Sequence, residues 1–348
     1  MQRGVFEIQF NWIFVIIAGG VILFFFLSLI SKQKATSDES INQDVLRRLD
    51  TILISTEQGY QTYKELHLVK TQLTFTCEDT SPSLTTQGII SNLQIGSFSV
   101  DTPTQILFTP PSLNTDTFQL WTDTWDQPFR VLPFLYVTAP EVSFYIVETT
   151  PPDRSQEIYE LLPANVSKKL ITAADINYLP NKNDQYSVVI FLDAAVNLAD
   201  PLYTPSQLKG DVRAVKVEST GDAGEVTFYK KSFVGNFFEN GTLPFIGNEM
   251  LLGSIVAADA QAYACNVKKA LVRYKTITEL HLARVINLSG MTDPTCIGPL
   301  TAGRRTLESM NTTLNFTTSA FQMLDLCSTD LQTSNEDLVR GRRCPLIY

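Results

Sequence analysis

Residues 142–192 read VSFYIVETTPPDRSQEIYELLPANVSKKLITAADINYLPNKNDQYSVVIFL, and this stretch decides the fold class. Residues 142–148 are rich in β-branched and aromatic side chains, which indicates a strand. The DRSQ sequence at 153–156 matches a capping box that opens a short helix, ended near Pro163. The apolar run at 187–192 predicts a buried strand. Strand, helix and strand in this order favour a parallel pair.

The residues on either side of this stretch also have the pattern of strands. Upstream, short runs alternate apolar and polar side chains, at residues 73–77, 94–100 and 105–109. Downstream, residues 211–218 and 225–230 flank a loop rich in turn-forming residues, which predicts a hairpin. Residues 71–250 are therefore expected to form a mixed α/β ectodomain built on a mixed β-sheet.

The last hundred residues change to a helical pattern. Residues 255–289 contain no Pro or Gly and carry apolar side chains at helical intervals. A second helical stretch covers about 301–340 and is interrupted by the β-branched run NTTLNFTT. We expect an antiparallel helical hairpin within a Cys-rich region, 251–348, and an α+β fold class overall.

Residues 10–30 (FNWIFVIIAGGVILFFFLSLI) carry no charged side chain. About 20 apolar residues cross the bilayer as a helix, so the run predicts a transmembrane helix with lipid as its partner. A cleaved secretory peptide fits less well, because its apolar region is shorter and ends in a cleavage site. Residues 31–70 follow as a polar stalk with a short amphipathic helix.

The side of the membrane on which the chain lies is not decided by flanking charges, because basic residues occur at both ends of the apolar run. Five N-x-S/T sequons and five Cys favour an oxidising exterior, although sequons also arise by chance in a Thr-rich chain. The sequons begin at Asn165, Asn240, Asn287, Asn311 and Asn315. We therefore expect residues 1–9 in the cytoplasm and the domain that follows the helix outside, at the cell membrane.

The chain of 348 residues has a net charge of −9, which argues against a nucleic-acid partner. The usual catalytic and nucleotide-binding signatures are missing, so no enzyme activity and no cofactor are expected. His67 and His281 each lie in the tetrapeptide ELHL, but in different local structure, which favours structural roles over a metal pair.

The best candidate for an interaction site is FQLWTDTWDQPFR, which holds two of the three Trp. Trp121 and Trp125 beside Asp123 and Asp126 could stack on a sugar between paired carboxylates, as in a glycosidase. The alternative is that the two indoles pack in the core while the Asp side chains cap turns.

The cysteines contain no C-x₂-C element, which argues against zinc and favours disulfides in an exterior domain. Cys265 and Cys327 are equidistant in sequence from residue 296, where the helical hairpin is expected to turn, so antiparallel packing predicts a bridge between them. Cys77, Cys296 and Cys344 are further disulfide candidates whose pairing stays open.

The segments RGVFEIQFNWIFVIIAGGVILFFF, TFTCE, WTDTWDQPFRVLPFLYVTAP, YACNVKKAL and CPLIY resemble a group of archaeal single-span membrane proteins with a large extracytoplasmic domain. The similarity spans most of the chain and implies an anchor, an ectodomain and structural roles for Cys77, Cys265 and Cys344. MQRG before the apolar run also resembles a pilin leader, but Glu7 falls third after Gly4 instead of fifth, which favours an uncleaved anchor.

These patterns together predict a membrane-anchored extracytoplasmic protein with a structural or interaction role at the cell surface, binding a protein partner or a second copy of itself. One alternative is a pilin-like or pilus-associated subunit, which processing after Gly4 would distinguish. The other is an extracytoplasmic hydrolase, which would need acidic or His side chains to converge in a pocket.

Overall fold

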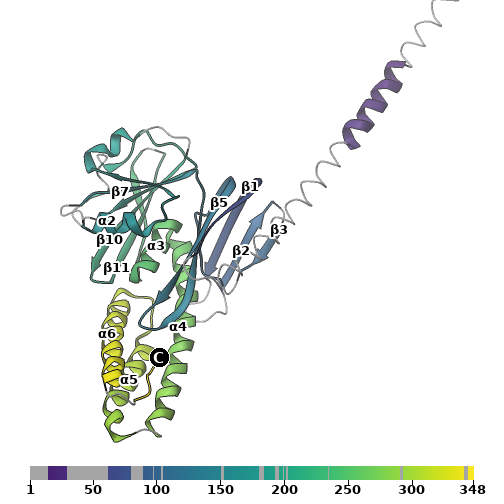
Figure 1. Cartoon of the computed structure of the whole chain (residues 1–348). Coiled ribbons are helices and arrows are strands. Elements are labelled where there is room, and N and C mark those ends of the chain that lie inside the picture. The colour runs from purple at the N-terminus through teal and green to yellow at the C-terminus, as the bar shows by residue number, and fades with distance from the viewer. Residues whose placement is uncertain are drawn as a thin grey trace, which may run out of the picture.

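The computed structural model forms two mixed β-sheets and a group of helices, as the α+β class predicts (Figure 1). The residues that it describes are 15–29, 62–79, 89–96, 98–102, 105–149, 153–179, 184–192, 196–198, 200, 203–233, 235–290, 293–340 and 344–348. The predicted amphipathic helix, which precedes residue 62 in the chain, and the leader at 1–9 lie outside these ranges.

Residues 15–29 form a helix whose large apolar side chains are exposed to solvent. It stands apart from the other described elements (Figure 1). Over the described residues, no helix has both the length and the apolar character needed to cross a membrane. Residues 10–14 and 30 of the predicted span are not among those residues, so the span stays a prediction.

The first sheet has the strand order β3-β2-β1-β5-β6-β4 and is antiparallel except for the pair β4 and β6. Its strands are β1 (Tyr63–Asp79), β2 (Ile89–Ile95), β3 (Phe98–Asp101), β4 (Leu107–Phe108), β5 (Ser112–Asp126) and β6 (Arg130–Thr138). β1 begins within the predicted stalk because Leu66 and Leu68 alternate with exposed residues and pack on the core. An irregularity between His67 and Thr71 then shifts the alternation by one residue.

The predicted strand at 94–100 is wrong: it is a hairpin of β2 and β3. Gly96 adopts a positive φ of 59°, which reverses the chain. Leu93 then pairs with Val100 and Ile95 pairs with Phe98. Both halves of the run alternate polar and apolar residues, so the sequence pattern alone reads as one continuous strand.

The second sheet has the order β12-β11-β10-β9-β7-β8. Its strands are β7 (Val142–Val147), β8 (Ser167–Ile171), β9 (Tyr186–Phe191), β10 (Asp211–Thr220), β11 (Ala223–Lys231) and β12 (Phe237–Ile246). β7 to β10 are mutually parallel, and β10, β11 and β12 are antiparallel, so the predicted mixed sheet is confirmed. Every residue of β7 and β9 is buried, as is usual for parallel strands covered on both faces.

Helix α2 (Asp153–Leu161) follows β7, as predicted, and the short 3₁₀ helix η1 (Ala173–Tyr178) follows β8. The Lys168 ammonium group donates to the carbonyl oxygens of Tyr159 and Leu162 at 2.6 and 2.5 Å. These bonds satisfy carbonyl groups at the end of α2, where a positive charge also favours the helix dipole.

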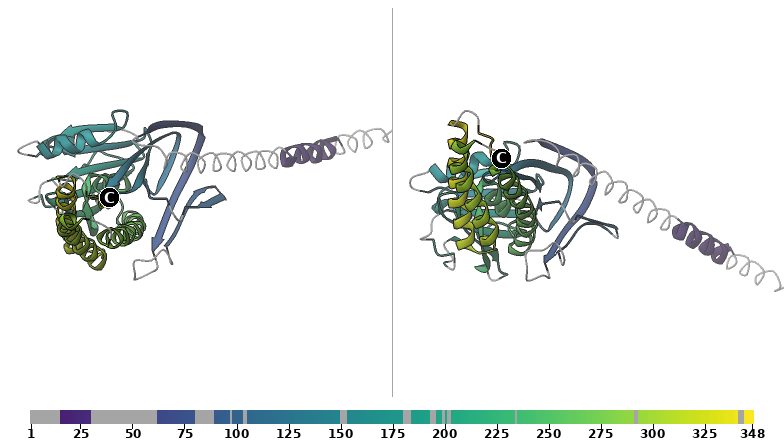
Figure 2. Two further views of the ribbon diagram at one scale, coloured as in Figure 1. Left: turned by 60° about the horizontal axis from the view of Figure 1, so that its bottom comes forward. Right: turned by 90° about the horizontal axis from the view of Figure 1, so that it is seen from below.

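Four helices complete the fold: α3 (Gly247–Ala257), α4 (Ala260–Ser289), α5 (Pro294–Thr313) and α6 (Thr318–Arg340). The single helix predicted at 255–289 is wrong, because Ala258 has a positive φ of 46° and the Asp259 side chain caps a new helix. The predicted two-helix hairpin is a group of three helices, α4, α5 and α6, that pack side by side (Figure 2).

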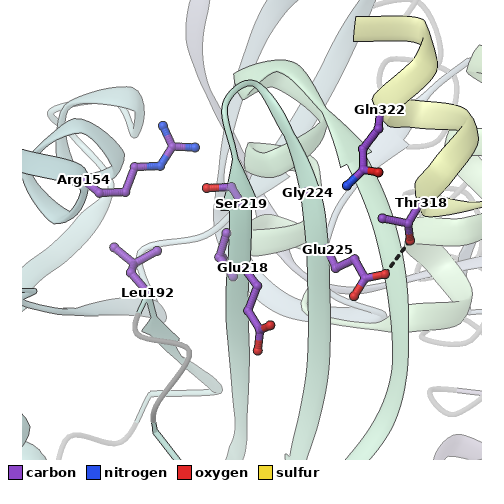
Figure 3. Close-up of a pocket in the computed structure, with 9 residues that line it drawn as sticks. Arg154, Leu192, Glu218, Ser219, Gly224, Glu225, Thr318 and Gln322 are labelled. Carbon is purple, nitrogen blue, oxygen red and sulfur yellow. Dashed lines mark hydrogen bonds between the residues drawn. The ribbon is translucent and has the colours of Figure 1, made fainter. Parts of the chain in front are cut away.

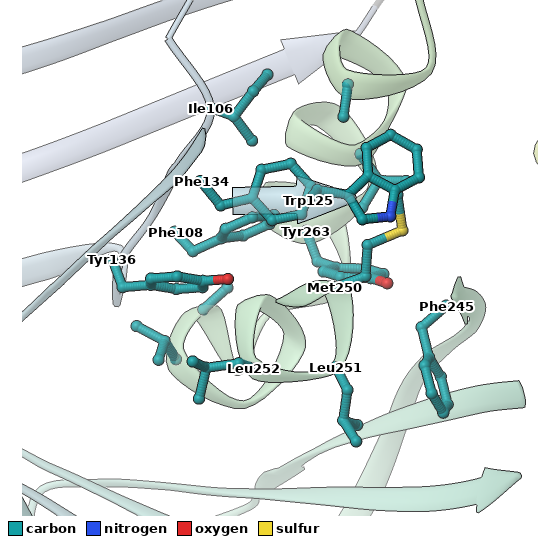
Figure 4. Packing of buried hydrophobic residues seen from close by; sticks show 14 of the residues in the cluster. Ile106, Phe108, Trp125, Phe134, Tyr136, Phe245, Met250, Leu251, Leu252 and Tyr263 are labelled. Carbon is teal, nitrogen blue, oxygen red and sulfur yellow. The ribbon is translucent and has the colours of Figure 1, made fainter. Parts of the chain in front are cut away.

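A large hydrophobic core joins both sheets and the helices. Figure 4 shows its aromatic centre, where Phe108 lies 5.4 Å from Phe134 and 5.8 Å from Tyr136 between ring centroids. Gly253 of α3 lies directly against Phe108, since a Cβ there would come within 2.8 Å of the ring. A smaller core lies on the opposite face of the second sheet.

Candidate functional site

The second sheet reverses its winding direction between β7 and β9. The chain passes from β7 through α2 to β8 on one side, and then through η1 to β9 on the other side of β7. In open α/β sheets, ligands bind beyond the carboxyl ends of the strands near such a reversal. A pocket of about 480 Å³ lies at this edge (Figure 3). We call it the edge pocket.

The edge pocket is built from five elements or their ends. Its lining residues are Arg154 of α2, Leu192 after β9, Val217, Glu218 and Ser219 of β10, Gly224 and Glu225 of β11, and Thr318 and Gln322 of α6. Val217 and Gly224 are buried and form the floor, whereas Glu218, Ser219 and Gln322 are exposed at the rim. The pocket is therefore polar at its opening and apolar below.

Hydrogen bonds and ion pairs hold the charged groups of the edge pocket. The Arg154 guanidinium donates through Nη1 to Glu157 at 2.6 Å. The Thr318 hydroxyl donates to Glu225 Oε1 at 2.5 Å, which links α6 to β11 (Figure 3). The Lys216 ammonium lies 2.9 Å from Glu218. The pocket thus presents one cationic and two anionic side chains whose positions are largely set.

A second group of charged side chains surrounds Glu249 in the first turn of α3. Burial, together with the charges of Asp123, Asp126 and Asp222, raises the pKa of Glu249 to about 7. The pKa of Asp325 is also raised by burial and by the charge of Asp222. Within the described ranges, no set of three or more His, Cys, Asp or Glu side chains could hold a metal ion.

The aromatic part of the proposed interaction site lies in the core. Trp125 is 0% exposed and stacks on Phe134 at 5.8 Å, and Trp121 stacks on Tyr136 at 5.3 Å. Their ring faces are therefore covered and cannot receive a sugar. The two Asp side chains belong to the charged group around Glu249. Because both indoles are buried, the structure favours the alternative in which they pack in the core.

The two histidines lie in different parts of the fold. His67 is an exposed residue of β1 beside Thr117, with 3.1 Å between its Nδ1 and the Thr hydroxyl. His281 lies on α4, 4.6 Å from the Phe129 ring and 3.3 Å from the Ile347 carbonyl oxygen. Burial lowers the pKa of His281. Neither histidine lines the edge pocket, so the hydrolase alternative has no converging site at these residues.

Two disulfides are present, Cys77–Cys265 and Cys296–Cys344, with Cα atoms 5.8 and 5.5 Å apart. The predicted bridge between Cys265 and Cys327 is wrong. Cys265 lies in the part of α4 that packs on β1, whereas α5 and α6 reverse the chain twice before Cys327 is reached. Cys327 is a free buried thiol, and burial raises its pKa.

The sequons differ in their exposure. Four of their asparagines are exposed: Asn165, Asn240, Asn287 and Asn315. Asn311 is half-buried, and its Oδ1 is buried without a hydrogen-bond partner among the described residues. The four exposed side chains are therefore accessible to a modifying enzyme, whereas Asn311 is partly covered.

None of the site residues expected from the sequence lines the edge pocket. One signal was available, because the predicted strand–helix–strand unit places residues just after its strands at a carboxyl edge. That rule points to Arg154 and Leu192. No comparable signal marks Thr318 and Gln322, because they come from a helix more than a hundred residues later.

Comparison with known proteins finds no matching family model, no matching curated protein and no matching solved structure. The resemblance to archaeal single-span proteins therefore stays a prediction.

Proposed function

We propose that this chain is a membrane-anchored extracytoplasmic protein with a structural or binding role at the cell surface. One observation carries the proposal: helix 15–29 exposes large apolar side chains along its whole length, from 40% at Leu29 to 74% at Phe24. Leaving one such side chain in water costs about 1.5–3 kcal/mol. The helix needs an apolar environment, and the uncharged run at 10–30 matches the thickness of a bilayer.

Two further features support an exterior domain. The chain carries two disulfides, which persist in oxidising compartments and are rare in the cytosol. Four of the five sequon asparagines are exposed on the folded surface. Both features agree with an amino terminus inside and the domain from β1 onward outside.

Cell fractionation tests the proposal directly. The full chain should stay in the membrane pellet after alkaline carbonate extraction, and protease added to intact cells should remove the domain from β1 onward. Replacing Phe24 and Leu27 with Arg should release the chain, because each central Arg costs about 2.5–3.5 kcal/mol in a spanning helix. Phe233→Arg is the control, since Phe233 is exposed outside the helix. A wild-type chain in the soluble fraction, or protected from external protease, would contradict the proposal.

Intact-mass measurement of the membrane form distinguishes the pilin-like alternative from a permanent anchor. A mature chain that begins after Gly4 would support processing of the pilin type, whereas retention of the first four residues favours a permanent anchor. Crosslinking in native membranes then distinguishes a second copy of the chain from a different protein partner.

A further inference from the structure

We propose that the edge pocket binds a small zwitterionic peptide, with the peptide carboxylate at Arg154 and its ammonium group at Glu225. This site goes beyond the anchoring role above. It does not depend on the anchor, because all its lining residues belong to helices α2 and α6 and to strands of the second sheet or the residue directly after β9.

The charges of the edge pocket face each other across its floor. Figure 3 shows the Arg154 guanidinium on one side and Glu225 with Gln322 on the other, with Ser219 and Gly224 between them. A ligand that fills the space must therefore satisfy a cation at one end and a carboxylate at the other. An α-amino group and an α-carboxylate at opposite ends of a short peptide meet this requirement.

Both charged groups keep hydrogen-bonding capacity for a ligand. A guanidinium has five N–H donors, and the Arg154 side chain remains 30% exposed while Nη1 donates to Glu157. A carboxylate has about four acceptor positions, and the Thr318 hydroxyl uses one of those on Glu225. The same two contacts hold the side chains in place, which lowers the entropy lost on binding.

The remaining lining favours a peptide over a ligand of one charge sign. An anion would meet Glu225, and a simple cation would meet Arg154, at an energetic cost in either case. Glu218 is paired with Lys216, as Arg154 is with Glu157, so both of these charges are partly balanced. Leu192 and Val217 offer an apolar surface for a ligand side chain, and about 480 Å³ falls in the roughly 300–1,000 Å³ range of small-ligand sites.

The test uses the full chain in mild detergent and three related probes: alanyl-leucine, its N-acetyl derivative and its carboxamide. The first is a zwitterion, the second lacks the ammonium group, and the third lacks the carboxylate. Binding is measured by titration calorimetry and by saturation-transfer NMR. We expect alanyl-leucine to bind at least about tenfold more tightly than either derivative, because each derivative loses one charge-assisted hydrogen bond.

Two variants assign the ends of the ligand. Arg154→Gln should weaken the binding of alanyl-leucine to the affinity of the carboxamide, while alanyl-leucine still binds more tightly than the N-acetyl form. Glu225→Gln should weaken it to the affinity of the N-acetyl form, while alanyl-leucine still binds more tightly than the carboxamide. Arg304→Gln and Glu308→Gln are matched controls, because these residues form an exposed ion pair on α5 away from the pocket. Thermal melts confirm that each variant is folded.

Three results would overturn the proposal. They are no binding of alanyl-leucine to the wild-type chain at millimolar concentration, equal binding of the three probes, and unchanged selectivity in both pocket variants. None of these results bears on membrane anchoring, so the two proposals fail separately.

Discussion

Replacing Glu249 with Gln should stabilise the protein at alkaline pH and leave its stability at acidic pH nearly unchanged. Glu249 lies near the buried start of α3, and burial is the largest reason why its pKa rises from 4.5 to about 7. The charges of Asp123, Asp126 and Asp222 act in the same direction. The folded protein therefore binds the proton of Glu249 more tightly than the unfolded chain does.

The sign and size of the effect follow from this difference. The stabilisation from protonated Glu249 is complete below pH 4.5 and is lost as the pH rises through about 7. One pKa unit corresponds to about 1.4 kcal/mol, so the loss in the wild-type chain amounts to at most about 3 kcal/mol. Glutamine is neutral at every pH and has a similar shape, so E249Q avoids this loss.

The assay is guanidinium unfolding of the full chain in detergent at pH 4, 6 and 8, with the disulfides intact. E249Q should match the wild-type chain at pH 4 and exceed it by about 2–3 kcal/mol at pH 8. The control is Glu279→Gln, at an exposed position of α4, which should follow the wild-type chain throughout. If E249Q gains nothing at pH 8, or gains the same amount at pH 4, the assignment of a buried, proton-binding Glu249 is refuted.

Three further predictions concern stability and modification. Replacing both Cys77 and Cys265 with Ser should lower the unfolding free energy by about 5 kcal/mol, because this disulfide spans 188 residues. The Cys296–Cys344 disulfide spans 48 residues, so its removal should cost less, and an equal or larger loss there would contradict the loop-entropy argument. Gly253→Ala should lower the free energy of unfolding, measured with denaturant, by about 1–3 kcal/mol, because the new methyl group clashes with Phe108. Gly298→Ala is the control: its methyl group would have no atom within 4 Å, and it should stabilise α5 by up to about 1 kcal/mol. Glycopeptide mass spectrometry of the folded surface form should find higher glycan occupancy at the four exposed sequon asparagines than at the half-buried Asn311, and the highest occupancy at Asn311 would contradict this order.

Much of the fold follows from local patterns. The apolar runs at 142–148 and 187–192 correspond to β7 and β9, which pair in parallel, and α2 begins at Asp153, where the DRSQ sequence predicted the start of a helix. The errors occur where single backbone angles break a pattern, at Gly96 between β2 and β3 and at Ala258 between α3 and α4. Hydrophobic periodicity averages over many residues, so it does not register one residue with a positive φ.

The candidate site was much harder to predict than the fold. Glu225 and Thr318 are ordinary polar residues in the sequence, and they become part of one pocket only because the start of α6 lies beside β11. The two Trp of the β5–β6 hairpin gave the opposite error. They resemble a sugar-stacking pair in sequence, yet the helices that cover β5 make them core residues.

The sequence by itself determined the α+β class, the uncharged apolar run at 10–30 and the two buried strands that become β7 and β9, because each depends on side-chain type and spacing within one segment. It did not indicate β8 (Ser167–Ile171), which lies between them in the chain. Only the tertiary structure decided that Cys265 joins Cys77 and not Cys327, and that the edge pocket carries opposite charges on opposite sides. These outcomes depend on how helices pack on sheets that lie far away in the sequence. Cys77 and Cys265, for example, are 188 residues apart. Local periodicity predicts which face of an element is buried, but the tertiary packing decides which residues that face contacts.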